Sequence, residues 1–213
     1  MSLLSCRANT DRACAYFREV QPDPFSELHY HTPYELLVAV VLSAQCTDVR
    51  VNQVTPALFA RFPNPKSLAE ATAEDIYPYI ASCSYPNAKA KYLAGIGARL
   101  VADFAGEVPD TREALESLPG VGHKSASVVL SIAFGVPALA VDTHVHRVAA
   151  RMGLTSHART PEETEKQLTQ NIPREDWSRA HHWLILHGRY ICVARKPKCA
   201  ACPFVNWCPQ IGL

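Results

Sequence analysis

The sequence predicts an all-α protein. Residues 34–44 are apolar on every side, a pattern typical of a central helix enclosed by others. The alternation of apolar and polar residues that marks a strand is nearly absent, and the connectors are short and punctuated by Pro, Gly or Asn, as helix–helix connections are. With 213 residues, 48% of them hydrophobic and 19% charged, the chain is long enough to bury a core as one large domain or two small ones.

The expected helices follow from caps and breakers. Residues 32–45 begin with a Thr cap and a Pro at the first helical position. Residues 47–62 form either two short helices or one kinked helix, because Pro56 removes a backbone donor and Thr55 can cap a second start. Further helices are predicted at 73–82, 87–105, 111–118, 123–134, 143–152, 161–171 and 174–188.

Charge is unevenly distributed along the chain. The formal net charge is only +1, yet residues 177–213 contain no Asp or Glu. The cations of this segment include Arg179, Arg189, Arg195, Lys196 and Lys198. A segment whose charges are all positive binds a polyanion or simply aids solubility.

We expect no membrane span and no secretory signal. The longest apolar stretch is too short to cross a bilayer, and the first residues lack a charged leader followed by a sustained apolar run.

Four of the eight cysteines are crowded into residues 192–208, with the spacing C-x6-C-x2-C-x5-C. A cytosolic chain keeps its thiols reduced, so a metal site is the best explanation for this crowding. Spacing does not choose between tetrahedral zinc and an iron–sulfur cluster, since both take four thiolates. The clustered residues are Cys192, Cys199, Cys202 and Cys208; the scattered Cys6, Cys14, Cys46 and Cys83 are interpreted as small buried apolar residues.

The stretch LPGVG at 118–122 predicts a tight turn before a helix. Gly120 and Gly122 permit positive φ and have no Cβ, so a ligand can approach the main chain closely. The first N–H groups of the next helix and its positive dipole end form an anion site that suits a phosphate. A plain helix–turn–helix connection explains the same glycines equally well.

Lys124 lies in the first turn of that helix, where the dipole disfavours a cation and Asp or Glu is usual. We expect such a lysine to lose its proton more easily, and a neutral amine is a nucleophile that forms Schiff bases. An exposed lysine without a chemical role is the alternative. Asp142, in turn, precedes the helix predicted at 143–152, where a helix N-cap would lie.

Several motifs in one order resemble the endonuclease III family of helix-hairpin-helix DNA glycosylases. They are LLVAVVLSAQCTDVRVN, EVPDTREALESLPGVG, LPGVGHKSASVVL, AVDTHVHRVAAR and HHWLILHGRYICVARKPKC, and together they extend from about Phe17 to Cys208. The resemblance implies two helical lobes and a C-terminal iron–sulfur cluster loop. It places a barrel-like domain with the hairpin at 26–136, and a second domain, with cluster loop 192–208, at 1–25 plus 137–213.

The resemblance also implies the chemistry. Lys124 would attack C1′ of a nucleotide bearing an oxidised pyrimidine, and Schiff-base formation and β-elimination would then cut the strand. The base must first be flipped out of the stack. Asp142 would stabilise positive charge on the sugar or assist proton transfer, which is compatible with an N-cap because helix N–H groups favour a charged carboxylate.

DNA contacts are implied by the same motifs. Gln45 would enter the space left by the flipped nucleotide, and His144 would lie near the DNA, although a lone histidine more often has a structural role. The phosphate contacts would come from the hairpin and the loop that the cluster pins; they involve Gly120, Gly122, His123, Arg195, Lys196 and Lys198.

Some positions depart from the family pattern. Where the family often has GLYNxKA this chain has SYPNAKA, so Tyr85 replaces an aliphatic residue that wedges into the duplex, and Pro86 stiffens the loop. His123 occupies a position that is commonly arginine, and Cys46 one that is usually small. None of these changes replaces Lys124 or Asp142. They therefore bear on which lesion is preferred and not on the class of reaction.

The cofactor that the resemblance implies is a [4Fe–4S] cluster, and the partner is double-stranded DNA with damaged pyrimidines or abasic sites. We expect a cytoplasmic monomer that associates with the nucleoid through DNA. Two other interpretations are open at this point. One is a monofunctional adenine or mismatch glycosylase, although such proteins lack lysine at the position of Lys124. The other is a non-catalytic DNA-binding or redox-sensing iron–sulfur protein.

Overall fold

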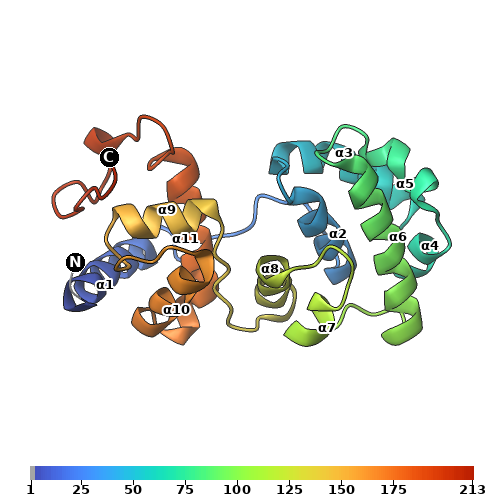
Figure 1. The fold of residues 1–213 in the computed structure, drawn as a ribbon, viewed down its shortest axis with the longest axis horizontal. Helices are drawn as coiled ribbons and strands as arrows, with labels where there is room; N and C mark the ends of the chain where they lie inside the picture. Colours follow the sequence, from blue (N-terminus) through green and yellow to red (C-terminus); the bar gives the residue numbers. More distant parts are fainter. Residues whose placement is uncertain (1–2) are drawn as a thin grey trace. The chain divides into compact units, whose positions relative to one another are not determined.

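The computed structural model describes residues 3–213, and every regular element in that range is helical (Figure 1). The all-α prediction is confirmed. The chain divides into two compact units, Ser26–Val136 and Pro137–Leu213 together with the N-terminal segment up to Phe25. No helix in the described range is long and apolar enough to cross a membrane.

The unit Ser26–Val136 is built around a helix that is buried on all sides. In α2 (Pro33–Ser43) eight residues are buried, and Thr32 caps the helix by accepting a hydrogen bond from the backbone of Glu35. The other helices of the unit are α3 (Asp48–Arg61), α4 (Pro65–Ala69), α5 (Ala73–Ile80), α6 (Pro86–Asp103), α7 (Arg112–Glu116) and α8 (His123–Phe134).

The structure decides one point of this unit that the sequence left open and adds one helix that it did not predict. Residues 48–61 form one helix with Pro56 inside it, so the second start at Thr55 is not used. The sequence analysis missed the short helix α4, which begins with a capping box between Asn64 and Ser67. It packs so closely on α6 that a Cβ on Gly97 would lie 2.6 Å from the backbone nitrogen of Ala69.

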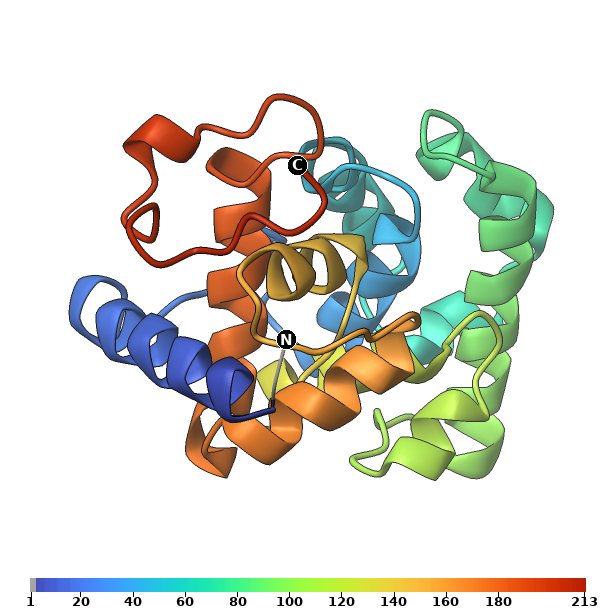
Figure 2. The ribbon, with the colours of Figure 1, turned by 60° about the vertical axis from the view of Figure 1, so that its left-hand side comes forward.

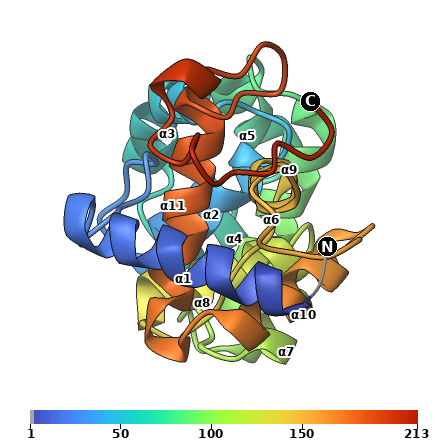
Figure 3. The ribbon, with the colours of Figure 1, turned by 90° about the vertical axis from the view of Figure 1, so that its left-hand side faces the viewer.

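The second unit packs α1 (Leu3–Val20), α9 (Thr143–Arg151), α10 (Pro161–Asn171) and α11 (Trp177–Tyr190) around one core. Figure 3 shows α1 crossing α11, and the contact is a stacked pair of Phe17 and Trp183 rings 5.6 Å apart. An ion pair between Arg18 and the buried Asp176 joins the same two segments. The predicted helix 174–188 is instead a short 3-10 turn, Arg174–Asp176, followed by α11.

The C-terminal segment after α11 is irregular apart from a 3-10 turn at Cys199–Ala201 (Figure 2). Its anchor is Phe204, which is 1% exposed and packs edge-on against Phe17 at 5.2 Å. The backbone nitrogen of Ile211 also donates to the carbonyl of Arg151 on α9. The segment is therefore held to the core of its unit at several points.

Candidate functional site

The turn between α7 and α8 is shaped by its glycines. Gly120 has a φ of +75°, and the following Val121 nitrogen donates to the carbonyl of Leu118 at 3.1 Å. Gly122 precedes α8 and supplies no side-chain cap, and a Cβ added there would meet nothing within 4 Å. The start of α8 therefore combines a positive dipole end with open space, which are the properties of an anion site.

Helix α6 supports this turn from one side. A Cβ on Gly120 would lie 2.6 Å from the Tyr92 ring, and one on Gly95 would lie 3.0 Å from Pro119. Glycine is required at position 120 for two reasons: it adopts the positive φ without strain, and it has no Cβ to clash with the Tyr92 ring. Leu118 and Val121 are buried, so the turn is held against the core of its unit.

A polar network joins α7 to α8 at the hairpin. Nη1 of Arg112 donates to Ser127 Oγ at 2.8 Å and lies 3.7 Å from a Glu116 oxygen, while Nδ1 of His123 lies 3.2 Å from the same Glu116 oxygen. His123 is therefore part of a network that spans the hairpin. Arg112 was missed in the sequence analysis; its position four residues before Glu116 was the available signal.

Lys124 is the second residue of α8 and its side chain is half-buried. The first turn of α8 contains no acidic residue of its own, and the nearby Glu116 carboxylate contacts His123. The lysine thus lies where the sequence predicted, directly after the hairpin turn.

Asp142 caps α9. Its Oδ1 accepts hydrogen bonds from the backbone nitrogens of His144 at 2.8 Å and Val145 at 2.9 Å, so the N-cap prediction is confirmed. The side chain is half-buried. His144 is also half-buried, with Nδ1 3.4 Å from a guanidinium nitrogen of Arg147.

Gln45 and Tyr85 share an unusual backbone. Both are exposed non-glycine residues in the left-handed region, with φ values of +54° and +55°. Gln45 lies in the turn after α2 rather than within that helix as predicted, since α2 ends at Ser43. Tyr85 directly precedes α6, and its side chain is 64% exposed.

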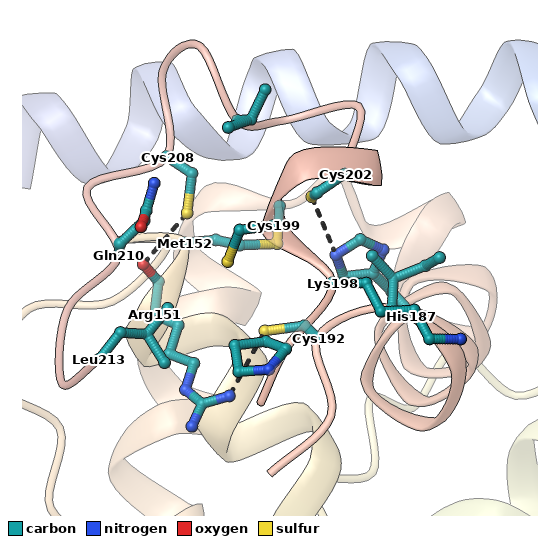
Figure 4. Close-up of a pocket in the computed structure, with 13 residues that line it drawn as sticks. Arg151, Met152, His187, Cys192, Lys198, Cys199, Cys202, Cys208, Gln210 and Leu213 are labelled. Carbon is teal, nitrogen blue, oxygen red and sulfur yellow. Dashed lines mark hydrogen bonds between the residues drawn. The ribbon is translucent and has the colours of Figure 1, made fainter. Parts of the chain in front are cut away.

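The four clustered cysteines line one cavity between α9, the end of α11 and the C-terminal segment (Figure 4). Nε2 of His187 lies 3.7 Å from Cys202 Sγ, and Nη1 of Arg151 lies 3.8 Å from Cys192 Sγ. Burial lowers the pKa of His187 to about 4, so its ring is neutral at physiological pH.

The cavity offers the donor set of a thiolate-bound metal centre, because all four clustered cysteines line it. Tetrahedral zinc and an iron–sulfur cluster both take four thiolates, so the lining by itself does not distinguish them.

Two arginines on α9, both missed in the sequence analysis, hold the chain at the first of these cysteines. Arg147 donates to the carbonyls of Gly188 at 2.8 Å and Cys192 at 3.1 Å, and Arg151 donates to that of Val193 at 2.8 Å. Their spacing of four residues on one helix face was the available signal. The loop that follows displays three exposed cations, Arg195, Lys196 and Lys198.

Comparison with known proteins identifies the family. The model for HhH-GPD superfamily base excision DNA repair proteins matches residues 38–174, and that for the iron–sulfur binding domain of endonuclease III matches residues 192–208. Endonuclease III from Bacillus subtilis is 46% identical over 89% of this chain and 86% of its own length. The Escherichia coli enzyme is 44% identical over 90% of both chains.

The chain belongs to the endonuclease III family. The structure of a trapped endonuclease III–DNA covalent intermediate matches with a TM-score of 0.90 and 42% identity, over 99% of this chain and 97% of the other. A non-covalent endonuclease III–DNA complex matches with a TM-score of 0.89. A thermostable thymine-DNA glycosylase, 24% identical, shares the fold with a TM-score of 0.83.

Membership in the endonuclease III family decides between the interpretations that the sequence left open. The chain is a bifunctional DNA glycosylase and AP lyase of base excision repair, and its cofactor is a [4Fe–4S] cluster. A monofunctional glycosylase and a non-catalytic redox sensor are the alternatives set aside.

Proposed function

We propose that Lys124 is the nucleophile of this member of the endonuclease III family and that Asp142 is the carboxylate that assists it. The observation that carries the proposal is the position of Lys124 at the start of α8, half-buried beside an uncapped helix end with open space at Gly122. A lysine amine in this position can serve as a nucleophile that forms a Schiff base with a sugar carbon.

In the proposed reaction the Lys124 amine attacks C1′ of a flipped nucleotide. The bond from C1′ to the base breaks, and the base leaves with the electron pair and takes up a proton. Opening of the sugar ring gives a Schiff base between C1′ and Nζ. Loss of a proton from C2′ then expels the 3′ phosphate oxygen and cuts the strand, and water finally releases the enzyme.

Asp142 supplies a negative charge fixed by the N–H groups of α9. Its proposed role is to stabilise the positive charge that develops on the sugar as the base departs and to help move the proton of the amine. Lys124 and Asp142 belong to different units of the chain. The proposal requires that both reach the same flipped nucleotide.

The proposed substrates are oxidised pyrimidines and abasic sites in double-stranded DNA, acted on by a monomer at the nucleoid in the cytoplasm. The hairpin glycines and His123 would contact phosphates, and Gln45, Tyr85 and His144 would lie near the extruded base. Arg195, Lys196 and Lys198 would add phosphate contacts. Excision rates on duplexes that each carry one oxidised pyrimidine or one oxidised purine test the substrate class.

The four cysteines of the cavity are the proposed ligands of the [4Fe–4S] cluster. Thiolates are the protein ligands that such clusters take, and the cavity is lined by four. The cluster would cross-link the C-terminal segment, and the basic loop with it, to the helical core. Its proposed contribution is to hold those cations in place.

Borohydride trapping tests the nucleophile. Reduction of a Schiff base on an abasic duplex converts it into a stable amine, so wild-type protein should become covalently attached to the DNA. Lys124→Gln should give no adduct yet bind the duplex with little change in Kd. The matched control is Lys91→Gln, an exposed lysine of the same unit, which should trap like wild type. An adduct with Lys124→Gln would refute the proposal.

A further inference from the structure

Lys89, in the first turn of α6, is a buried cation that the proposed chemistry does not use. The residue is 3% exposed, and its Nζ donates to the carbonyl oxygens of Leu42 and Ala44, at 2.8 Å each. These carbonyls lie at the C-terminal end of α2, where helix carbonyls have no partner within their own helix. Lys89 thus caps α2 from a neighbouring helix, where the dipole favours a cation.

Burying an ammonium group costs free energy, and this burial lowers the pKa of Lys89. The thiols of Cys46 and Cys83 act on the same pKa in the opposite direction. A solvent-exposed lysine would avoid the cost. The fold therefore retains a buried cation whose hydrogen bonds are made to backbone carbonyls at the end of another helix.

The backbone that Lys89 holds leads directly into Gln45. The Ala44 carbonyl belongs to the peptide that joins Ala44 to Gln45, and Gln45 is strained at a φ of +54°. A left-handed conformation in a residue other than glycine costs about 1–3 kcal/mol and persists only when its surroundings fix it. The Lys89 ammonium binds the carbonyl of the residue immediately before Gln45.

The backbone of the same lysine holds Tyr85. Its nitrogen donates to the Tyr85 carbonyl at 3.1 Å, in the first turn of α6, and Tyr85 is the second exposed residue in the left-handed region. Lys89 thus binds the backbone beside two exposed side chains: its ammonium binds the carbonyl of Ala44, next to Gln45, and its amide binds the carbonyl of Tyr85.

We propose that Lys89 is a positioning residue for base extrusion, which fixes Gln45 relative to Tyr85 so that both are presented to the duplex at a set spacing. The inference rests on the proposed DNA roles of Gln45 and Tyr85. Without the ammonium, the turn after α2 relaxes away from the left-handed conformation and Gln45 leaves the position needed to replace a flipped nucleotide.

Lys89→Met tests the proposal, because methionine has similar length and no donor. Single-turnover excision of an oxidised pyrimidine from a duplex should fall about tenfold, the effect of losing about 1.4 kcal/mol of positioning. Lyase cleavage of a single-stranded abasic oligonucleotide, which needs no extrusion, should change by less than about twofold on this basis. Equal losses on the two substrates would overturn the proposal. Lys91→Met, an exposed lysine of the same helix, is the control.

A double-mutant cycle with Gln45→Ala separates positioning from a general structural effect. If Lys89 acts through Gln45, the double variant should lose no more duplex excision than the more impaired single variant. Losses that multiply would overturn the proposal, as would wild-type excision by Gln45→Ala. Borohydride adducts with wild-type protein are formed in either case, so failure of this inference is distinct from failure of the proposed chemistry.

Lys89→Gln covers the case in which Lys89→Met does not fold. Its amide can donate to one of the two carbonyls, so we expect a smaller loss of duplex excision with the same sparing of single-stranded lyase activity. Thermal unfolding of each variant verifies that it is folded. Wild-type excision from the duplex by Lys89→Gln, together with a Lys89→Met variant that does not fold, would overturn the proposal.

Discussion

At the scale of single residues, Asp142 shows how one side chain combines a structural and a proposed chemical role. Its carboxylate accepts two helix N–H groups, which explains its place at the start of α9 without reference to function. The same two bonds hold its charge at a fixed point. The N-cap requires only a hydrogen-bond acceptor, whereas the proposed catalytic role requires a negative charge. A single substitution can therefore separate the two roles.

Asp142→Asn makes that separation. Asparagine is as good an N-cap as aspartate, so we expect the midpoint of thermal unfolding to change little. Because the amide carries no charge, base excision should fall on the order of 10²-fold, the usual effect of losing one electrostatic stabiliser. Stopped assays of excision and a calorimetric scan measure the two effects. If Asp142→Asn excises bases at the wild-type rate, the role of Asp142 is only to cap α9, and the proposed catalytic role is refuted.

At the scale of elements, α6 and the C-terminal loop organise the surfaces proposed to meet DNA. Helix α6 contacts the end of α2 through Lys89 and the hairpin turn through Tyr92. In the other unit, Arg147 and Arg151 of α9 hold the chain around the first clustered cysteine. Three exposed cations lie on the loop between Cys192 and Cys199, and both of these cysteines line the cavity.

Replacing Lys196 and Lys198 with Ala should weaken DNA binding and flatten its dependence on salt. Each phosphate contact releases counterions, so losing two contacts should reduce the slope of log K against log salt concentration by about 2. Binding isotherms at several salt concentrations give the slope. Lys166→Ala, an exposed lysine on α10, is a control expected to lower the slope less. An unchanged slope in the double variant would count against this loop as a DNA contact.

At the scale of the whole molecule, the two units have separate cores, and the described tryptophans report on only one of them. Trp177, Trp183 and Trp207 all belong to the unit that contains the cysteine cavity. Phe204 ties the cysteine segment into the core of that unit. Tryptophan fluorescence should therefore report the destabilisation of this unit when the cluster is lost.

Cys199→Ala should remove the broad visible absorbance and the iron of the purified protein. The transition seen by tryptophan fluorescence should move to lower temperature, because a cross-link between the C-terminal segment and the core is lost. Far-UV circular dichroism, to which both units contribute, should retain a later component from the unit without tryptophan. Cys46→Ala, another half-buried cysteine, should keep its iron. A colourless wild-type protein with stoichiometric zinc would contradict the cofactor assignment.

Much of this protein is determined by local sequence. The buried character of α2, the cap at Asp142 and the glycine turn before α8 follow from composition and spacing, because periodicity, capping and positive φ are properties of a few consecutive residues. The crowding of four cysteines within residues 192–208 makes a metal site the best explanation from sequence alone. The resemblance of ordered motifs then predicted the family.

Contacts between distant segments were decided only by the tertiary structure. Lys89 binds the carbonyls of Leu42 and Ala44, which precede it by 47 and 45 residues. The Tyr92 ring leaves no room for a side chain at Gly120. Neither contact can be predicted from residues that are neighbours in the sequence. That Arg151 and His187, from two different helices, lie beside the clustered thiols is likewise a result of folding. Short-range order is fixed by the chemistry of adjacent residues, whereas these arrangements depend on how helices pack, and packing involves the whole unit at once.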